Sequence, residues 1–447
     1  MTSFNPDIDL HALLSECCKL ALLAGKVIQE VHRERVAGGN SVLGGHLKED
    51  GDAKSVATIA DIRAQRVIVT SLRRKFPGLC IVGEEEEDET ILDGGAENTE
   101  TNTEEYLTVH PFFASHCLDS LGGTGDSGSL KLLRLDSVVV YIDPLDGTHE
   151  FVEGRVGNVQ TLIGIAVNGY PIAGAIGLPF WEQARGDHDQ GVNIARGRQG
   201  GAVIAGVVGV GTCGFVIPTH KSSPMAAPLS LKLASSESIK HPALVAVQGV
   251  LMTHPVNASA VVKPACGNKI LSLLRRECDV AVFNLKTSLW DTCATQALLV
   301  AAGGRVTDLV GCSINHSHPS LARGGDTGNP YGVIATVSGV DHSDLVRRLR
   351  ALPEVTALFA KSGLIQPSNG NASATDVCRD TFGLPLSTVT LSQLVGASVQ
   401  SYCCPEEDAQ RYLMSEAARV YLTYESQREE FARGRPASLF YKRAVMR

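Results

Sequence analysis

A short acidic motif is the part of this sequence best equipped to do chemistry. It is the run Asp143-Pro144-Leu145-Asp146-Gly147-Thr148, which follows the apolar residues 138–142. The apolar run predicts a buried strand, and the Pro and Gly beyond it shape a turn that can aim both carboxylates at one point. Mg²⁺ prefers hard oxygen ligands of this kind and usually keeps waters and phosphate oxygens in its shell. We therefore expect Asp143 and Asp146 to share metal ions, with the Leu145 carbonyl as a further ligand, although the Asp-x-x-Asp spacing alone is more typical of a solvated turn.

Three further carboxylates lie where predicted elements could bring them to the same metals. Glu84 follows the short apolar run 79–82, at the start of an acidic stretch whose later members we expect to be solvated. Asp291 precedes a helix-like run, where it could cap the helix, although the neighbouring Trp290 favours a packed site. Asp61 lies near the start of another predicted helix. The sequence thus offers several candidate ligands from separate elements.

Hydrophobic periodicity predicts the elements that must position these residues. Apolar residues at helical spacing predict an amphipathic helix over 10–31 and a second helix over about 60–75. Strand-like runs cover 79–82, 138–142, 161–167 and 172–178, and Asn168-Gly169 is typical of a hairpin turn between the last two. The apolar stretch 201–218 is nearly long enough to span a membrane, but its regular glycines favour paired buried strands. From Leu244 onward, strand-like and helix-like stretches alternate, as in an α/β unit.

Composition divides the chain into a catalytic part and two additions. We expect an N-terminal α+β subdomain at 1–180, a C-terminal α/β subdomain at 181–358, and an appended helical tail of unknown role at 359–447. Residues 89–137 are rich in Glu, Thr, Asn, Gly and Ser, which predicts a long and partly disordered insertion. The tail contains a polar linker over 366–375 and a predicted helix that begins near Pro405 and ends near Gly434.

Charge and cysteine content narrow the partners and the compartment. The chain has 447 residues with 40 Lys and Arg against 48 Asp and Glu, a formal net charge of −8. Such a chain lacks the broad basic surface that nucleic acid polymers require, whereas a small anion can still bind through a metal ion. Its first residues lack the pattern of a signal peptide, so we expect neither membrane insertion nor secretion. The 12 cysteines form no Cys-x-x-Cys pair, which favours reduced thiols and a cytoplasmic location; the oligomeric state is left open.

Taken in order, these motifs resemble the lithium-sensitive, Mg²⁺-dependent phosphatase superfamily that includes the inositol monophosphatases. Within it, the chain is most similar to the 3′(2′),5′-bisphosphate nucleotidase family. The resemblance runs from about Leu13 to Leu349 with matching order and spacing. Its motifs are Lys75-Phe76-Pro77 with Gly83-Glu84-Glu85, Asp143 to Gly154, Gly267-Asn268-Lys269-Ile270, Trp290-Asp291-Thr292-Cys293-Ala294 and Gly303-Gly304.

The resemblance implies a fold, a set of ligands and a reaction. The fold would be a layered αβαβα sandwich with metals at the junction of two subdomains. Two or three Mg²⁺ ions would be held by Glu84, Asp143, the Leu145 carbonyl, Asp146 and Asp291. Asp61 and Thr148 would together activate the attacking water. The residues expected to contact substrate are Gly147, Thr148, Ser236, Glu237, Gly267, Lys269 and Asp291.

The implied substrate is a small bis-phosphorylated metabolite. We expect the enzyme to convert 3′-phosphoadenosine 5′-phosphate to AMP and phosphate, and also to accept 3′-phosphoadenosine 5′-phosphosulfate, which would place it in sulfur assimilation. Two departures leave the substrate open. Glu237 stands where this family usually has a His, and a Glu at this place resembles the inositol polyphosphate 1-phosphatase branch instead. The approach to Gly267 is also altered and reads Pro264-Ala265-Cys266. An inositol polyphosphate 1-phosphatase is therefore the first alternative, and a catalytically silent phosphoryl-binding relative is the second.

One histidine pair was considered as an additional metal site. His316 and His318 are separated by one residue in a polar segment over 313–328 that is rich in His, Pro, Arg, Gly and Asp. Because no partner pattern accompanies them, we interpret the pair as part of a solvated loop.

Overall fold

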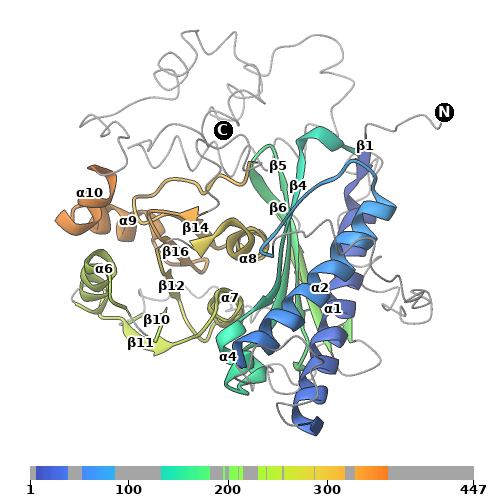
Figure 1. The fold of residues 1–447 in the computed structure, drawn as a ribbon. Helices are drawn as coiled ribbons and strands as arrows, with labels where there is room; N and C mark the ends of the chain where they lie inside the picture. The colour runs from blue at the N-terminus through green and yellow to red at the C-terminus, as the bar shows by residue number, and fades with distance from the viewer. Residues whose placement is uncertain are drawn as a thin grey trace, which may run out of the picture.

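The protein folds as five alternating layers of helix and sheet (Figure 1). The computed structural model describes residues 7–38, 53–85, 132–181, 195–196, 201–209, 211–214, 230–237, 239–253, 256–285, 287–317 and 328–360. Three buried hydrophobic clusters separate the layers, one on each side of the smaller sheet and one on the outer face of the larger sheet. The predicted αβαβα sandwich is confirmed.

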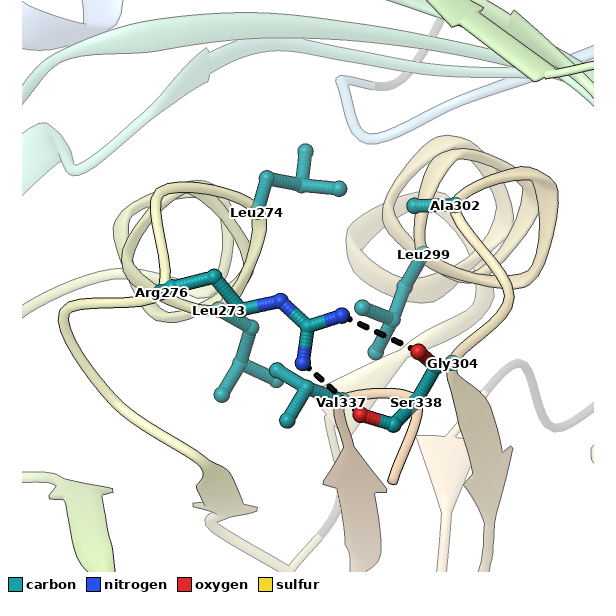
Figure 2. Close-up of a pocket in the computed structure, with 8 residues that line it drawn as sticks. All are labelled: Leu273, Leu274, Arg276, Leu299, Ala302, Gly304, Val337 and Ser338. Atoms are coloured by element: carbon teal, nitrogen blue, oxygen red, sulfur yellow. Dashed lines mark hydrogen bonds between the residues drawn. The ribbon is translucent and has the colours of Figure 1, made fainter. Parts of the chain in front are cut away.

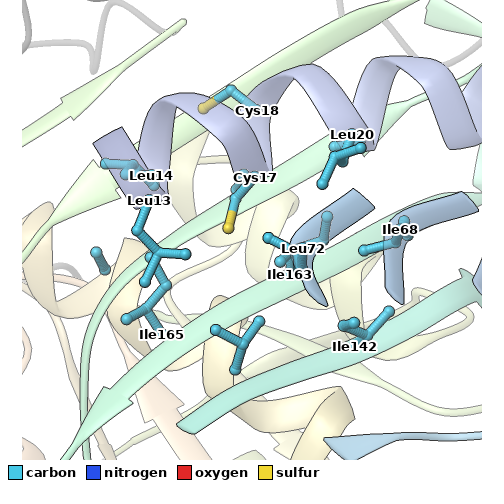
Figure 3. Packing of buried hydrophobic residues seen from close by; sticks show 14 of the residues in the cluster. Leu13, Leu14, Cys17, Cys18, Leu20, Ile68, Leu72, Ile142, Ile163 and Ile165 are labelled. Carbon is cyan, nitrogen blue, oxygen red and sulfur yellow. The ribbon is translucent and has the colours of Figure 1, made fainter. Parts of the chain in front are cut away.

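The outer helical layer consists of α1 (Leu10–Gly38) and α2 (Ala53–Lys75), which pack on one face of the large sheet. Leu13 and Cys17 on α1 and Leu72 on α2 are fully buried against strand residues such as Ile163 (Figure 3). This contact follows from the helical spacing of the apolar residues, which gives each helix one apolar face. Both predicted helices are confirmed, and both extend further than expected.

The large sheet contains the strands that carry most of the acidic motif. Its order is β2-β4-β5-β6-β8-β7, with β9 paired to β8; β2 runs parallel to β4, and the other pairs are antiparallel. The strands are β2 (Cys80–Gly83), β4 (Val138–Asp146), β5 (Gln160–Val167), β6 (Tyr170–Leu178), β7 (Ala195–Arg196), β8 (Ala202–Val207) and β9 (Gly211–Cys213).

Two sequence-based predictions for this sheet are confirmed. Asn168 and Gly169 both have positive φ, 50° and 83°, as a two-residue turn between β5 and β6 requires. The apolar stretch 201–218, which is nearly long enough to span a membrane, forms the antiparallel β8–β9 hairpin in its described part. Across the described residues, no helix combines the length and the apolar character needed to cross a bilayer.

The remaining layers are two central helices, a smaller sheet and an outer group of helices. The central helices α7 (Cys266–Leu274) and α8 (Leu289–Ala301) pack between the two sheets (Figure 1). The smaller sheet has the order β11-β10-β12-β16-β14, and α6, α9 and α10 cover its far face. The bounds are β10 (Lys232–Ser235), α6 (Pro242–Met252), β11 (Ser259–Val262), β12 (Val280–Phe283), β14 (Arg305–Thr307), β16 (Val333–Thr336), α9 (His342–Arg350) and α10 (Pro353–Ala360).

The predicted insertion ends earlier than expected. Residues 132–134 form β3 (Leu132–Arg134), which pairs with β1 (Asp7–Asp9), and a 3₁₀ turn follows at Leu135–Ser137. Leu133 and Leu135 are buried, so these residues belong to the folded core. The rest of the insertion, the linker at 366–375 and the predicted helix near Pro405 lie outside the described residues.

Among the described residues, the cysteines follow the expectation of reduced thiols with one exception. Free thiols occur at Cys17, Cys18, Cys80, Cys266, Cys278, Cys293 and Cys312. Cys213 is disulfide-bonded, so the expectation of reduced thiols is wrong at this residue.

Candidate functional site

The site begins where two parallel strands end side by side. Gly83 of β2 is in register with Ile142 of β4, so the residues that follow emerge at the same edge of the sheet. The Glu84 amide donates to the Ile142 carbonyl at 3.1 Å, which places Glu84 beside the start of the acidic motif. A side chain from α2 fixes this segment further, because the Gln65 carboxamide donates to the Glu85 carbonyl and accepts from its amide at 2.7 and 3.0 Å.

An irregular turn carries the two aspartates of the motif. The β4–β5 register shifts between Asp143 and Asp146, and the Leu145 amide donates to Asp143 Oδ1 at 3.0 Å. Gly147 then adopts φ 94°, a left-handed conformation that favours glycine, immediately before the short helix α4 (Thr148–Val152). The turn therefore buries both carboxylates at the strand end, with Asp143 only 2% and Asp146 5% exposed.

Helix α7 begins directly against Asp146. The backbone amides of Cys266 and Gly267 donate to its two carboxylate oxygens at 3.0 and 2.6 Å. The positive end of a helix and two charge-assisted hydrogen bonds stabilise an ionised carboxylate. This contact joins the large sheet to the central helices at the site.

Helix α8 supplies Asp291, which both caps the helix and belongs to the packed site, the two roles that the sequence left open. One oxygen accepts a hydrogen bond from the Ser288 amide at 2.7 Å, which caps the helix. The same side chain also faces the site. Ligand atoms of Asp146, Asp291 and Cys266 all lie within 4.8 Å of one another, a spacing that can hold a metal ion.

The carboxylates raise one another's pKa, because they are buried and close together. Desolvation, together with the charges of Glu84, Asp146, Asp291 and Asp61, holds the pKa of Asp143 well above its ordinary value. Desolvation and Asp291 raise the pKa of Asp146 to about 7, and desolvation raises that of Asp291 to about 6. The pKa of the more exposed Glu84 is also raised, by partial burial and by Glu85 and Asp146. So many like charges are stable together only with protons or cations among them.

Asp61 and Thr148 are brought near the cluster but are not paired. Desolvation and the charges of Glu84 and Glu85 raise the pKa of Asp61 to about 9. Among the described residues, Asp61 Oδ1 is buried without a hydrogen-bond partner. The Thr148 hydroxyl instead donates to the Leu145 carbonyl at 3.2 Å, so that carbonyl is less free than the sequence suggested. An unpartnered buried carboxylate oxygen beside this cluster fits a site for divalent metal ions.

The residues expected to contact substrate are only partly brought together. Gly147 and Gly267 line the acidic cluster through the contacts above. Lys269 is buried, donates to the Ala265 carbonyl at 3.1 Å and lies over the Phe283 ring, and burial lowers its pKa.

The loop after β10 carries the other two residues of this set. Ser236 is half-buried and Glu237 is exposed, and within the described part of the chain Glu237 forms no ion pair with Lys240 or Lys269. A hydrogen bond of 2.9 Å from the Lys263 amide to the Ser235 carbonyl joins this loop to the segment that leads into α7.

Sequence reasoning missed three residues of the site. Cys266 was noted as a departure from the resemblance but not as a neighbour of the metal ligands. Gln65 and Gln160 were not considered, although Gln65 holds the Glu84 segment and the Gln160 amide donates to Asn268 on α7 at 3.0 Å. Buried glutamines carry no sequence pattern that separates them from surface ones, whereas a Cys directly before the Gly267 motif was a usable signal.

The interpretation of His316 as part of a solvated loop is wrong. His316 is fully buried, its Nδ1 lies 3.2 Å from the Ile314 carbonyl, and its Nε2 lies 3.0 Å from the Thr292 hydroxyl at the start of α8. Burial lowers the pKa of His316 to about 3, so the ring is neutral. His316 therefore supports the helix that presents Asp291, while His318 lies outside the described residues.

A separate hollow between α7 and α8 has a different character (Figure 2). The Arg276 guanidinium lies across it and donates to the carbonyl and the hydroxyl of Ser338 at 2.8 and 3.0 Å. The lining residues are Leu273, Leu274, Arg276, Leu299, Ala302, Gly304, Val337 and Ser338. These residues include neither a carboxylate nor a thiol, so the acidic cluster is the better candidate for a metal site.

Comparisons with known proteins agree with the fold. The model of the inositol monophosphatase family matches residues 9–353. The chain is 30% identical to 3′(2′),5′-bisphosphate nucleotidase 1 of Homo sapiens over 338 residues, 74% of this chain and 93% of that protein. It is 30% identical to the protein of the same name from Dictyostelium discoideum over 342 residues, 74% of this chain and 94% of that protein.

A solved structure supports the fold alone. Inositol monophosphatase II from Staphylococcus aureus MSSA476 matches with a TM-score of 0.51 at 15% identity, covering 79% of this chain and 100% of that one. The layered fold and its carboxylate cluster are those of a metal-dependent phosphatase. The chain belongs to the inositol monophosphatase family.

Proposed function

We propose that this phosphatase is a Mg²⁺-dependent 3′(2′),5′-bisphosphate nucleotidase that converts 3′-phosphoadenosine 5′-phosphate to AMP and phosphate. The observation that carries the proposal is the convergence of Asp143, Asp146 and Asp291 with Glu84 and Asp61 at one edge of the sheet. The two nucleotidases that are 30% identical over most of the chain favour a nucleotide substrate. The related sulfated nucleotide is a further expected substrate, because it carries the same 3′-phosphate.

One set of site residues would bind metal ions, and another would transfer a proton. Glu84, Asp143, the Leu145 carbonyl, Asp146 and Asp291 offer only oxygen donors, the ligands that Mg²⁺ prefers. When bound, Mg²⁺ would lower the pKa of a coordinated water and neutralise phosphoryl oxygens.

Thr148 and Asp61 would handle the proton of the attacking water. A rotation of the Thr148 hydroxyl away from the Leu145 carbonyl would leave that carbonyl to a metal ion alone. Asp61 Oδ1, which lacks a partner among the described residues, is then an acceptor for that hydroxyl, since α2 and α4 pack against each other. Thr148, oriented in this way, would take the proton of the water and pass its own hydroxyl proton to Asp61 as the water attacks the phosphorus in line with the leaving 3′ oxygen.

Glu237 favours the alternative of an inositol polyphosphate 1-phosphatase. An exposed carboxylate that pairs with no cation in the described part of the chain could accept hydrogen bonds from ring hydroxyls, whereas it would repel the second phosphate of a nucleotide. Glu237→His should therefore lower KM for the nucleotide with little change in kcat if the nucleotide is the substrate. A loss of activity on inositol 1,4-bisphosphate would support the alternative.

The test is phosphate release by the purified full chain with Mg²⁺ against both substrates. We expect rapid release from the nucleotide, dependence on Mg²⁺, and inhibition by Li⁺ at concentrations where Na⁺ has no effect. Release from the inositol phosphate alone would overturn the substrate assignment, and no release from either would favour a catalytically silent relative. We also propose a cytoplasmic setting, which the seven free cysteines among the described residues support and the disulfide at Cys213 does not.

A further inference from the structure

Cys266 places a thiol directly beside the candidate metal ligands. Its Sγ and one carboxylate oxygen each from Asp146 and Asp291 lie within 4.8 Å of one another. Asp146 is buried, whereas Cys266 and Asp291 are half-buried, so the group can be reached from solvent. A phosphatase that works with Mg²⁺ alone has no need of a thiol here, because Mg²⁺ prefers oxygen ligands.

The backbone around Cys266 is held firmly in place. Its amide donates to Asp146 Oδ1 at 3.0 Å, and the preceding Ala265 has a positive φ of 60°. The Ala265 carbonyl accepts from the Lys269 ammonium at 3.1 Å. The thiol is therefore presented from a fixed segment and needs only a side-chain rotation to approach a bound ion.

A second and independent feature points to a ligand at the same place. Gln160 is fully buried, and among the described residues its Oε1 has no hydrogen-bond partner, although its amide donates to Asn268. A Cβ added at Gly267 would lie 2.8 Å from this oxygen and 2.7 Å from Asp146 Oδ2. Both oxygens thus face the same point at the start of α7. A buried carbonyl oxygen without a donor is an available contact for a cation or its bound water.

We propose that the position between Asp146 and Asp291 binds a thiophilic divalent cation of the Zn²⁺ class, with Cys266 Sγ as the third ligand. On binding, the thiol loses its proton to solvent as the sulfur–metal bond forms. In a tetrahedral zinc site, bond lengths of about 2.0 to 2.3 Å place ligand atoms about 3.5 Å apart, which small rotations of these three side chains can reach.

The inference rests on the proposed function in one respect. The same two aspartates are expected to hold Mg²⁺, so the thiophilic ion would displace Mg²⁺ and inhibit the phosphatase. Divalent zinc binds mixed oxygen and sulfur ligands far more tightly than Mg²⁺ does. Because of the thiol, thiophilic divalent cations would inhibit this enzyme at lower concentrations than they would inhibit a site built from oxygen ligands alone.

The test is a titration of the metal-free full-length protein with Cd²⁺, which gives an ultraviolet charge-transfer band when a thiolate binds it. The chain has 12 cysteines, so the diagnostic signal is the part of the band whose half-saturation excess Mg²⁺ shifts to a higher Cd²⁺ concentration. We expect the wild type to show this part with a stoichiometry of about one. Cys266→Ala should abolish it, and Asp291→Asn should raise the Cd²⁺ concentration at half-saturation at least about tenfold.

Cys312→Ala is the matched control, because Cys312 is also a half-buried free thiol but lies outside the group. This variant should keep the Mg²⁺-sensitive part of the band. The inference is overturned if the wild type lacks that part or if Cys266→Ala retains it. The measurement uses no substrate, so a protein that shows the band without hydrolysing the nucleotide would contradict the proposed function and support the inference.

Discussion

At the scale of single residues, the site depends on how closely α7 approaches the carboxylates. Gly267 donates its amide to Asp146 at 2.6 Å, and its missing side chain leaves room for the oxygens of Asp146 and Gln160. This packing makes Gly267 a positioning residue whose effect on activity can be separated from its effect on folding.

Gly267→Ala should reduce kcat/KM by at least about a hundredfold, because the added methyl would collide with Asp146 Oδ2 at 2.7 Å and displace a metal ligand. KM for Mg²⁺ should rise as well. Gly249→Ala on α6 is the matched control, since a Cβ there meets no atom within 4 Å in the described structure. Steady-state kinetics with Mg²⁺ titration check both variants, and equal activity of the two would refute the positioning role.

Some of these residues could be predicted from the sequence, and others could not. Asp143, Asp146 and Asp291 were found because carboxylates at strand and helix ends follow visible apolar patterns. Gln65, Gln160 and the burial of His316 were missed, because single polar residues that become buried depend on contacts between distant elements. The Thr148 hydrogen bond to Leu145 likewise depends on a turn geometry that the motif does not specify.

At the scale of elements, α8 is supported by a neutral histidine. His316 contacts Thr292 at the first turn of α8, and His342 contacts the hydroxyls of Thr307 and Thr336 on the smaller sheet. Burial lowers the pKa of both histidines to about 3, from an ordinary value of 6.5. Both are therefore neutral in the folded protein at any pH near neutrality.

The contribution of His316 and His342 to the stability of the protein should fall as the pH is lowered from 7 to 5. Between pH 6.5 and 3 the unfolded chain binds a proton at each histidine and the folded chain does not, so acidification favours unfolding. Each histidine should contribute a loss of about 2 kcal/mol between pH 7 and pH 5.

Urea unfolding of wild type and His316→Gln at both pH values checks this expectation. Between pH 7 and pH 5, the two histidines lower the free energy of unfolding of the wild type. The variant should show about half of that decrease, whatever its free energy of unfolding at pH 7. An unchanged pH dependence would show that His316 does not titrate in this way.

The strands and helices were largely predicted, because their periodicity is local. The helices at 10–31 and 60–75 and the hairpin at Asn168-Gly169 follow from residue spacing and turn chemistry. Strand β3 was missed because its three residues follow a long polar stretch and are stabilised by pairing with β1, a partner more than a hundred residues away in the chain. Short strands of this kind are defined by their partners rather than by their own sequence.

At the scale of the whole molecule, the described part of the five layers ends with α10 at residue 360. Among the described residues, the members of the three hydrophobic clusters run from residue 8 to residue 358. The family match ends at residue 353. We therefore expect the catalytic unit to fold without the tail.

Deletion of residues 361–447 should leave a folded phosphatase whose kcat is within about threefold of the full chain. The reason is that the candidate ligands and the described core lie before the deleted segment. Thermal unfolding and phosphate release measured on both proteins test this. A folded truncation without activity would show that the tail completes the site.

The proposed nucleotidase activity requires that Asp143 hold the metal ions. The most direct measurement compares phosphate release from 3′-phosphoadenosine 5′-phosphate by the wild type and by Asp143→Asn across a range of Mg²⁺ concentrations. We expect Mg²⁺-dependent turnover by the wild type and a loss of about three orders of magnitude or more in the variant, with its circular dichroism unchanged. Turnover by Asp143→Asn within tenfold of the wild type would contradict the account.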